Sequence, residues 1–245
     1  MTEFPKPYPS QYELRGDTHS CYGSDFRKCV NYTFNNQGYR SDFDYSTECQ
    51  DHIVVCLGSS IATGHGLELE NTFGAIVAKH FDQTLWNMGQ GCFRSNNQTV
   101  LDQIKFLSNS DLKIDYYLIQ FTHINRCGNQ FENYLELDTA QAILNFEQTL
   151  KQVDQLLQGK KWCWMLADYS KVTLPDWIVN HPNLIVIDPD SVDFVETKTY
   201  AKSAPSKHAL KMLSLHPGVK WNQQMADLMI EYFNETSPKL AGSPA

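Results

Sequence analysis

The chain has 245 residues, a formal net charge of −8 at pH 7 and a hydrophobic fraction of 42%. That length and hydrophobic fraction suit one large domain with a substantial core. The negative charge, with no stripe of Lys or Arg, disfavours binding to a phosphate backbone, so we expect no nucleic-acid partner. No apolar run approaches the roughly 18 residues of a membrane span, and residues 1–20 contain no signal-peptide pattern. We therefore expect a cytoplasmic protein with no membrane partner.

The cysteine pattern favours the same setting. The seven cysteines are odd in number and scattered: Cys21, Cys29, Cys49, Cys56, Cys92, Cys127 and Cys163. Cys56 and Cys163 lie inside apolar runs, as buried thiols do. A reduced intracellular protein fits this pattern better than a disulfide framework. There is no His-Glu-x-x-His motif and no close cysteine pair, so we predict no metal site.

The chain divides into three parts. Residues 1–50 are aromatic and polar with little periodicity, and we interpret them as an N-terminal extension packed on the main domain. The main domain is predicted over residues 51–236, followed by a disordered tail at 237–245. Within the domain, short continuous apolar runs predict five parallel strands covered on both faces. These runs are 53–57, 84–88, 115–121, 161–167 and 184–188.

Helical periodicity fills the intervals between the predicted strands. One helix begins near Phe73, and a second is predicted to start at Ser95, where Gln98 would complete a capping box. A third stops at Gly159, and the last begins with Pro217 at its first helical position. The alternation of strands and helices predicts an α/β fold, a doubly wound three-layer sandwich around a five-strand parallel sheet.

Ser60 carries the strongest functional signal. Residues 54–64 read Val-Val-Cys-Leu-Gly-Ser-Ser-Ile-Ala-Thr-Gly, an apolar run that ends in a Gly and two hydroxyls. Such a run delivers a serine into a sharp turn at the sheet edge. A serine hydroxyl needs a base to take its proton, and His216, just before the last helix, is the candidate base.

Other residues predicted at this edge could stabilise an oxyanion. In a doubly wound sheet, ligands bind beyond the carboxyl ends of the strands. Gly89 follows the second predicted strand, and Asn125 follows the third. The backbone N–H groups of Ser60 and Gly89, with the Asn125 amide, are therefore candidate donors to a developing negative charge. Residues 188–193 follow the fifth predicted strand.

These residues resemble the SGNH (GDSL-type) hydrolases, a family of esterases, lipases and carbohydrate O-deacetylases. The first block of the family reads Gly-Asp-Ser with a Gly four residues later. Gly58, Ser60 and Gly64 match it, whereas Ser59 replaces the Asp. Gly89 is similar to the glycine of the second block. The resemblance implies a flavodoxin-like fold, with Ser60 as nucleophile and His216 as base.

The third block departs from the family pattern. It reads Gly-x-Asn-Asp in the family, but an ungapped alignment places Ile124 at the Asn position. Asn125 serves as an oxyanion donor only if the register slips by one residue. His123 and Thr122 are the alternatives.

The fifth block departs as well. It reads Asp-x-x-His in the family, but Leu213 stands three residues before His216. A backbone carbonyl or an Asp within 188–193 would then have to orient the histidine. Loss of the orienting carboxylate can cost about 10⁴ in kcat in a well-studied triad.

The sequence thus predicts a serine esterase that needs no cofactor and hydrolyses a small acyl ester, such as a carbohydrate O-acetyl ester. Its expected partner is a small ester or an acylated carbohydrate. The alternative is a catalytically degenerate binding or structural module, which Ser59, the altered third block and Leu213 favour. A third interpretation is phosphate or flavin binding at the same edge.

Overall fold

The structure, a computed structural model, describes residues 33–46, 51–64, 66–90, 96–124, 139–166, 173–187 and 216–236. Within these residues, parallel strands form one sheet in the order β2-β1-β3-β4. The strands are β1 (Ile53–Gly58), β2 (Thr84–Gly89), β3 (Ile114–Phe121) and β4 (Lys161–Leu166). This order is the start of the flavodoxin-like doubly wound arrangement. The predicted α/β class and parallel sheet are confirmed.

The prediction of a fifth strand at 184–188 is wrong. Among the described residues the sheet has four strands, and Leu184 makes only an isolated parallel bridge with Trp164. The Trp164 N–H donates to the carbonyl of Asn183 at 2.9 Å, and the Ile185 N–H donates to the carbonyl of Trp164 at 2.7 Å. An apolar run specifies burial, whereas the length of a ladder depends also on the partner strand. The segment therefore lies beside β4 without forming a continuous strand.

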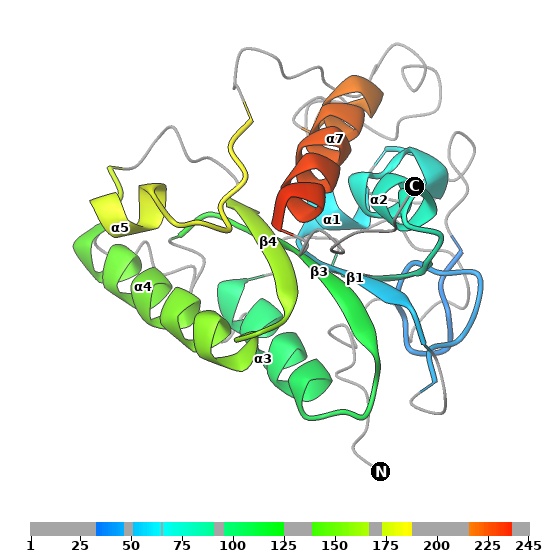
Figure 1. Cartoon of the computed structure of the whole chain (residues 1–245), viewed down its shortest axis with the longest axis horizontal. Helices are drawn as coiled ribbons and strands as arrows, with labels where there is room; N and C mark the ends of the chain where they lie inside the picture. Colours follow the sequence, from blue (N-terminus) through cyan, green and yellow to red (C-terminus); the bar gives the residue numbers. More distant parts are fainter. Residues whose placement is uncertain are drawn as a thin grey trace, which may run out of the picture.

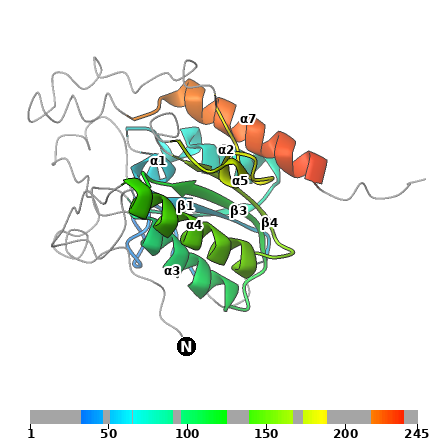
Figure 2. The same ribbon diagram turned by 90° about the vertical axis from the view of Figure 1, so that its left-hand side faces the viewer.

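Helices cover both faces of the sheet. Figure 2 shows α2 and α7 above the strands and α3 and α4 below them. The long helices are α2 (Phe73–His80), α3 (Asn97–Ser108), α4 (Thr139–Leu156) and α7 (Val219–Thr236). Shorter elements are α1 (Ser60–Thr63), the 3₁₀ helix η2 (Leu69–Asn71) and α5 (Asp176–Val179). The result is the three-layer sandwich of Figure 1.

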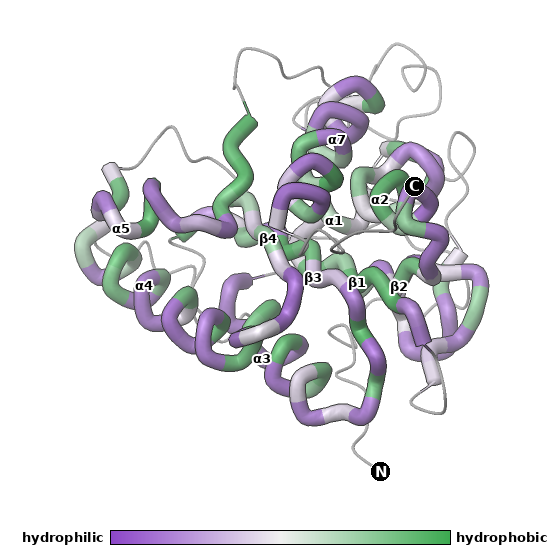
Figure 3. Tube along the Cα trace, viewed as in Figure 1, coloured by the Kyte–Doolittle hydropathy of each residue, from purple (hydrophilic) through white to green (hydrophobic). Residues whose placement is uncertain are grey.

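Each strand supplies side chains to two separate cores. In β1, Val54 and Cys56 pack in the core formed with α2 and α7. Ile53, Val55 and Leu57 pack in the core formed with α3 and α4. Successive strand residues point to opposite faces, so a strand with two covered faces, such as β1, has apolar residues on both. In Figure 3 the centre of the sheet is accordingly green, whereas the outer helices alternate between purple and green.

Two helix starts differ from the prediction. α3 begins at Asn97, and its cap is Asn96, whose side chain accepts the N–H of the third helical residue at 2.7 Å. Ser95, the predicted start, lies outside the described residues. Asn and Ser are equally good N-caps, so the sequence alone does not choose between them. α7 begins at Val219, so Pro217 precedes the helix instead of occupying its first position.

The described part of the N-terminal segment is packed into the domain. Tyr39, Arg40 and Tyr45 are 0%, 1% and 3% exposed. The Tyr45 ring stacks on Trp86 with 4.6 Å between ring centroids, and its hydroxyl donates to the carbonyl of Asn87 at 3.0 Å. The predicted tail at 237–245 lies outside the described residues. None of the described helices is both long and apolar enough to cross a membrane.

Candidate active site

A sharp turn follows β1 and carries Ser60. Gly58 ends the strand with φ +147°, and Ser59 is extended, with φ −93° and ψ −157°. Ser60 then opens α1, which ends after four residues at Gly64, where φ is +75°. Ser60 is partly exposed, whereas Ser59 beside it is buried. The turn therefore presents the Ser60 side chain at the carboxyl edge of the sheet.

His216 lies against Ser60, although 156 residues separate the two in the chain. The distance between His216 Nε2 and Ser60 Oγ is 2.8 Å, which is hydrogen-bond distance. His216 is only 7% exposed. A neutral imidazole with an unprotonated Nε2 accepts the serine proton, so the two side chains have the geometry of a nucleophile and its base.

Asn222 ties the helix that follows His216 to α2. Its Oδ1 accepts the backbone N–H of Phe73 at 3.0 Å. Its Nδ2 donates to the carbonyl of Gly218 at 2.9 Å, and the side chain is 1% exposed. Gly218 is two residues from His216, so this buried amide fixes the start of α7, and with it the backbone near the histidine, to the first turn of α2.

Gly89 lies at the same edge as Ser60, because β1 and β2 end in register with Gly58 opposite Gly89. Its N–H donates to Oδ1 of Asn87 at 3.1 Å. A Cβ added at Gly89 would lie 2.6 Å from the backbone nitrogen of Thr63, so glycine is required where β2 approaches α1. An oxyanion role for Gly89 remains a prediction. It requires a substrate oxygen to compete with the Asn87 side chain for that N–H.

The third block is only partly described. The Thr122 N–H donates to Oδ1 of Asn97 at 2.9 Å, which fixes the backbone just past β3. Ile124, at the position of the family's Asn, is 4% exposed and belongs to the core. Asn125 and residues 188–193 lie outside the described residues. Their roles as oxyanion donor and orienting acid remain predictions.

Arg40 supports the segment that follows Ser60, a role that the sequence did not reveal. Its guanidinium, 1% exposed, donates to three carbonyls in the segment after Ser60. Nη1 reaches the carbonyls of Thr63 at 2.9 Å and Gly64 at 2.8 Å, and Nη2 reaches that of Leu67 at 2.6 Å. Arg40 thus fixes the C-terminal end of α1. Nothing local in the sequence indicates which carbonyls Arg40 binds.

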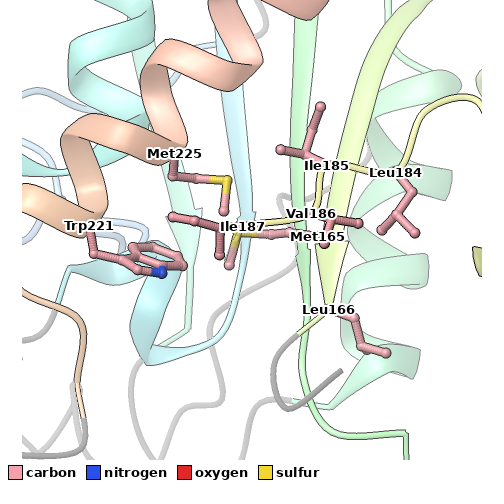
Figure 4. A pocket seen from close by; sticks show the side chains of 8 residues that line it. All are labelled: Met165, Leu166, Leu184, Ile185, Val186, Ile187, Trp221 and Met225. Carbon is pink, nitrogen blue, oxygen red and sulfur yellow. The ribbon is translucent and has the colours of Figure 1, made fainter. Parts of the chain in front are cut away.

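An apolar cavity of about 50 Å³ lies where residues 184–187 run beside the end of β4 (Figure 4). It is lined by Met165, Leu166, Leu184, Ile185, Val186, Ile187, Trp221 and Met225. None of these lining side chains titrates or is a nucleophile. Nor do three His, Cys, Asp or Glu side chains gather as a metal site in the part of the chain that the structure describes.

His181 has a structural role. Its Nδ1 accepts from Trp164 Nε1 at 3.1 Å and from the Asn183 N–H at 3.2 Å. The ring proton therefore resides on Nε2, which lies 3.2 Å from both carboxylate oxygens of Asp154. These contacts fix the turn before the bridge to β4.

No protein-family model and no curated protein matches the chain. Solved structures resemble it at low identity. A lipolytic protein of the G-D-S-L family from Desulfitobacterium hafniense DCB-2 is 16% identical, with a TM-score of 0.43 over 76% of this chain and 99% of that one.

Two carbohydrate esterases are similar at the same level. One is 16% identical, with a TM-score of 0.46 over 78% of this chain and 70% of that one. The other, a carbohydrate esterase family 2 enzyme from Corynascus thermopiles, is 9% identical, with a TM-score of 0.42 over 78% and 68%. Similarity of this degree identifies no activity, so the fold assignment depends on the strand order of the chain itself.

Proposed function

We propose that this protein is a serine esterase that hydrolyses a small acyl ester. The observation that carries the proposal is the 2.8 Å contact between Ser60 Oγ and His216 Nε2 at the carboxyl edge of a parallel sheet. Ligands of doubly wound folds bind at this edge. Ser60 is partly exposed there, so a substrate carbonyl can reach its hydroxyl.

The proposed reaction has two steps. Ser60 Oγ attacks the ester carbonyl carbon while His216 Nε2 takes the hydroxyl proton. The tetrahedral oxyanion is then held by the N–H groups of Ser60 and Gly89 and by the Asn125 amide. Collapse of this intermediate expels the alcohol, which receives the proton from His216, and leaves an acyl group on Ser60. Water, deprotonated by His216, then releases the acid and restores the serine.

We propose an O-acetyl ester of a carbohydrate as the substrate. The support is the match of Gly58, Ser60 and Gly64 to the first block of the SGNH family, which includes carbohydrate O-deacetylases. No step in this scheme uses a cofactor or a metal ion.

The test combines labelling with turnover. An activated fluorophosphonate should modify Ser60, and the protein should hydrolyse p-nitrophenyl acetate. Ser60→Ala should abolish both reactions, and His216→Gln should slow hydrolysis by at least about 10³-fold. Ser108→Ala, at the end of α3, is the matched control and should change neither. Turnover that survives Ser60→Ala would show that the proposal is wrong.

The second candidate is a degenerate binding module. Two observations favour it: the Gly89 N–H already has an acceptor in Asn87, and Ile124 is a core residue. This candidate requires that a panel of acetylated sugars and p-nitrophenyl esters give no turnover. It also requires that sugar binding, measured by calorimetry, be the same in Ser60→Ala as in the unmodified protein.

A further inference from the structure

The side chain of Gln120 lies directly behind the nucleophile turn. Gln120 is on β3 and is 0% exposed. Its Oε1 accepts both the backbone N–H of Ser59 at 2.7 Å and the Oγ–H of Ser59 at 2.6 Å. Its Nε2 donates to the carbonyl of Phe121 at 2.7 Å. That last bond orients the amide so that its oxygen faces Ser59.

Gln120 also fills the space beside Gly58. A Cβ added at Gly58 would lie 2.5 Å from the carbonyl oxygen of Gln120 and 2.8 Å from its Oε1. The backbone of Gly58 has φ +147°, a conformation that side chains rarely adopt. Gln120 therefore lies against both residues that precede Ser60: it accepts hydrogen bonds from Ser59 and packs beside Gly58.

The orientation of Ser60 depends on such contacts. α1 is a single turn of four residues, and a helix of that length has no stability of its own. Position 59 carries Ser where the family has Asp. An Asp carboxylate at position 59 could only accept hydrogen bonds, so it would face Gln120 Oε1, which is also an acceptor. The Ser59 hydroxyl instead donates to Gln120 Oε1. Ser59 and Gln120 therefore form a matched pair in this chain.

We propose that Gln120 is a positioning residue for the nucleophile and acts through Ser59. It holds the backbone of residues 58–59 so that Ser60 Oγ meets His216 Nε2. The catalytic consequence of this role rests on the proposed function. The geometric part of the proposal, that Gln120 sets the distance between Ser60 and His216, is independent of the proposed function.

The test compares two buried glutamines. Gln120→Met keeps the volume and removes the acceptor of both Ser59 donors. Gln103→Met is the matched control, because Gln103 is equally buried and its hydrogen bonds go to Tyr39 and to the carbonyl of Met88, not to residues 58–60. The Met88 carbonyl belongs to the same peptide group as the Gly89 N–H, so this control is read through the ring resonances of His216 and not through labelling. A displacement of about 1 Å can cost about 10²-fold in rate. We therefore expect Gln120→Met to slow fluorophosphonate labelling of Ser60 by that order and to lower kcat with KM nearly unchanged.

Two further measurements separate positioning from general destabilisation. Gln103→Met should leave the ring resonances of His216 in place even where its thermal midpoint falls as far as that of Gln120→Met. Ser59→Ala should slow labelling less than Gln120→Met, because the Ser59 N–H still donates. In the Gln120→Met background, Ser59→Ala should have no further effect.

A readout independent of activity keeps the two proposals distinguishable. The ring resonances of His216, identified by their loss in His216→Gln, report on its hydrogen bond to Ser60. They should shift in Gln120→Met and stay in place in Gln103→Met. If the unmodified protein neither labels nor hydrolyses esters, the esterase proposal fails and these resonances alone decide the role of Gln120. Equal behaviour of the two Met variants in these resonances overturns the inference.

Discussion

At the residue scale, two glycines shape the candidate site as much as its reactive side chains do. Gly58 leaves room for Gln120, and Gly89 leaves room for the backbone of α1. Both are glycines that the family resemblance singles out, and the structure gives each a steric reason. The space that a glycine leaves open can therefore be as decisive for Ser60 as any hydrogen bond.

We expect Gly89→Ala to lower the free energy of unfolding by about 1–3 kcal/mol, because its Cβ would meet the backbone of Ala62 and Thr63. Labelling of Ser60 should slow in the same variant, since α1 must move. Gly159→Ala is the control: its φ is +76°, but nothing lies within 4 Å of the new Cβ. It should cost about 1–2 kcal/mol through backbone strain and leave labelling unchanged. Urea unfolding and labelling rates measure both effects; equal losses of labelling would contradict the steric explanation.

The positions of Arg40 and Gln120 could not be predicted from the sequence, whereas those of Ser60, Gly89 and His216 could. Ser60, Gly89 and His216 were found because each sits in a local pattern, a strand end or a helix start. Arg40 and Gln120 were not found, because their partners lie 23 to 27 and 61 residues away. A polar residue inside an apolar strand does not reveal which loop it bonds. Such contacts depend on the tertiary fold and become visible only in the structure.

At the scale of elements, the apolar runs predicted β1 to β4 to within one residue at each end, because strands covered on both faces are predominantly apolar. The prediction of a fifth strand was wrong, because the apolar run does not determine how far the segment pairs with β4. Likewise, Asn96 and Ser95 are equally suitable as the N-cap of α3, so the sequence does not determine where that helix begins. The apolar runs thus predicted the strands β1 to β4, whereas the start of α3 and the pairing of residues 184–187 depend on individual contacts.

The coupling of α7 to α2 gives a prediction at this scale. Asn222→Ala leaves the buried Phe73 N–H without its side-chain acceptor, and we expect a loss of about 1–3 kcal/mol in the free energy of unfolding. Asn222→Asp keeps the acceptor and adds negative charge at the start of α2, so it should recover part of that loss. The exposed neighbour variant Gln223→Ala should change stability by less than about 0.5 kcal/mol.

Urea unfolding of the three variants provides the measurement. Because His216 precedes α7, labelling of Ser60 should also slow in Asn222→Ala but not in Gln223→Ala. If Asn222→Asp is as unstable as Asn222→Ala, the bond to α2 is not what Asn222 contributes.

At the scale of the whole molecule, buried phenols limit stability in alkali. Burial raises the pKa of Tyr117 to about 12, and it also raises the pKa of Tyr39 and Tyr45 above the ordinary value. A pKa raised in the folded state gives stability that is complete below the unfolded pKa, near 10, and is lost as the pH rises toward 12. The protein should therefore become less stable above about pH 10.

Tyr117→Phe tests this expectation, because it keeps the ring and removes the ionisable group. Between pH 9 and pH 11 the variant should lose about 1 kcal/mol less free energy of unfolding than the unmodified protein. Urea unfolding at both values measures the difference. Measurements at pH 7 and pH 8 serve as the control, because the difference in stability between the two proteins should be the same at both values. An identical alkaline loss in both proteins would count against this assignment.

The distance in sequence between Ser60 and His216 also has a consequence for synthesis. A chain emerges from the ribosome with its N-terminal part first. Arg40, Ser60 and Gln120 are thus all available while His216, 156 residues after Ser60, is still untranslated. The nascent polypeptide can therefore carry an assembled serine turn but no base beside it. If the proposed esterase function holds, ester cleavage would have to wait until His216 and α7 are in place.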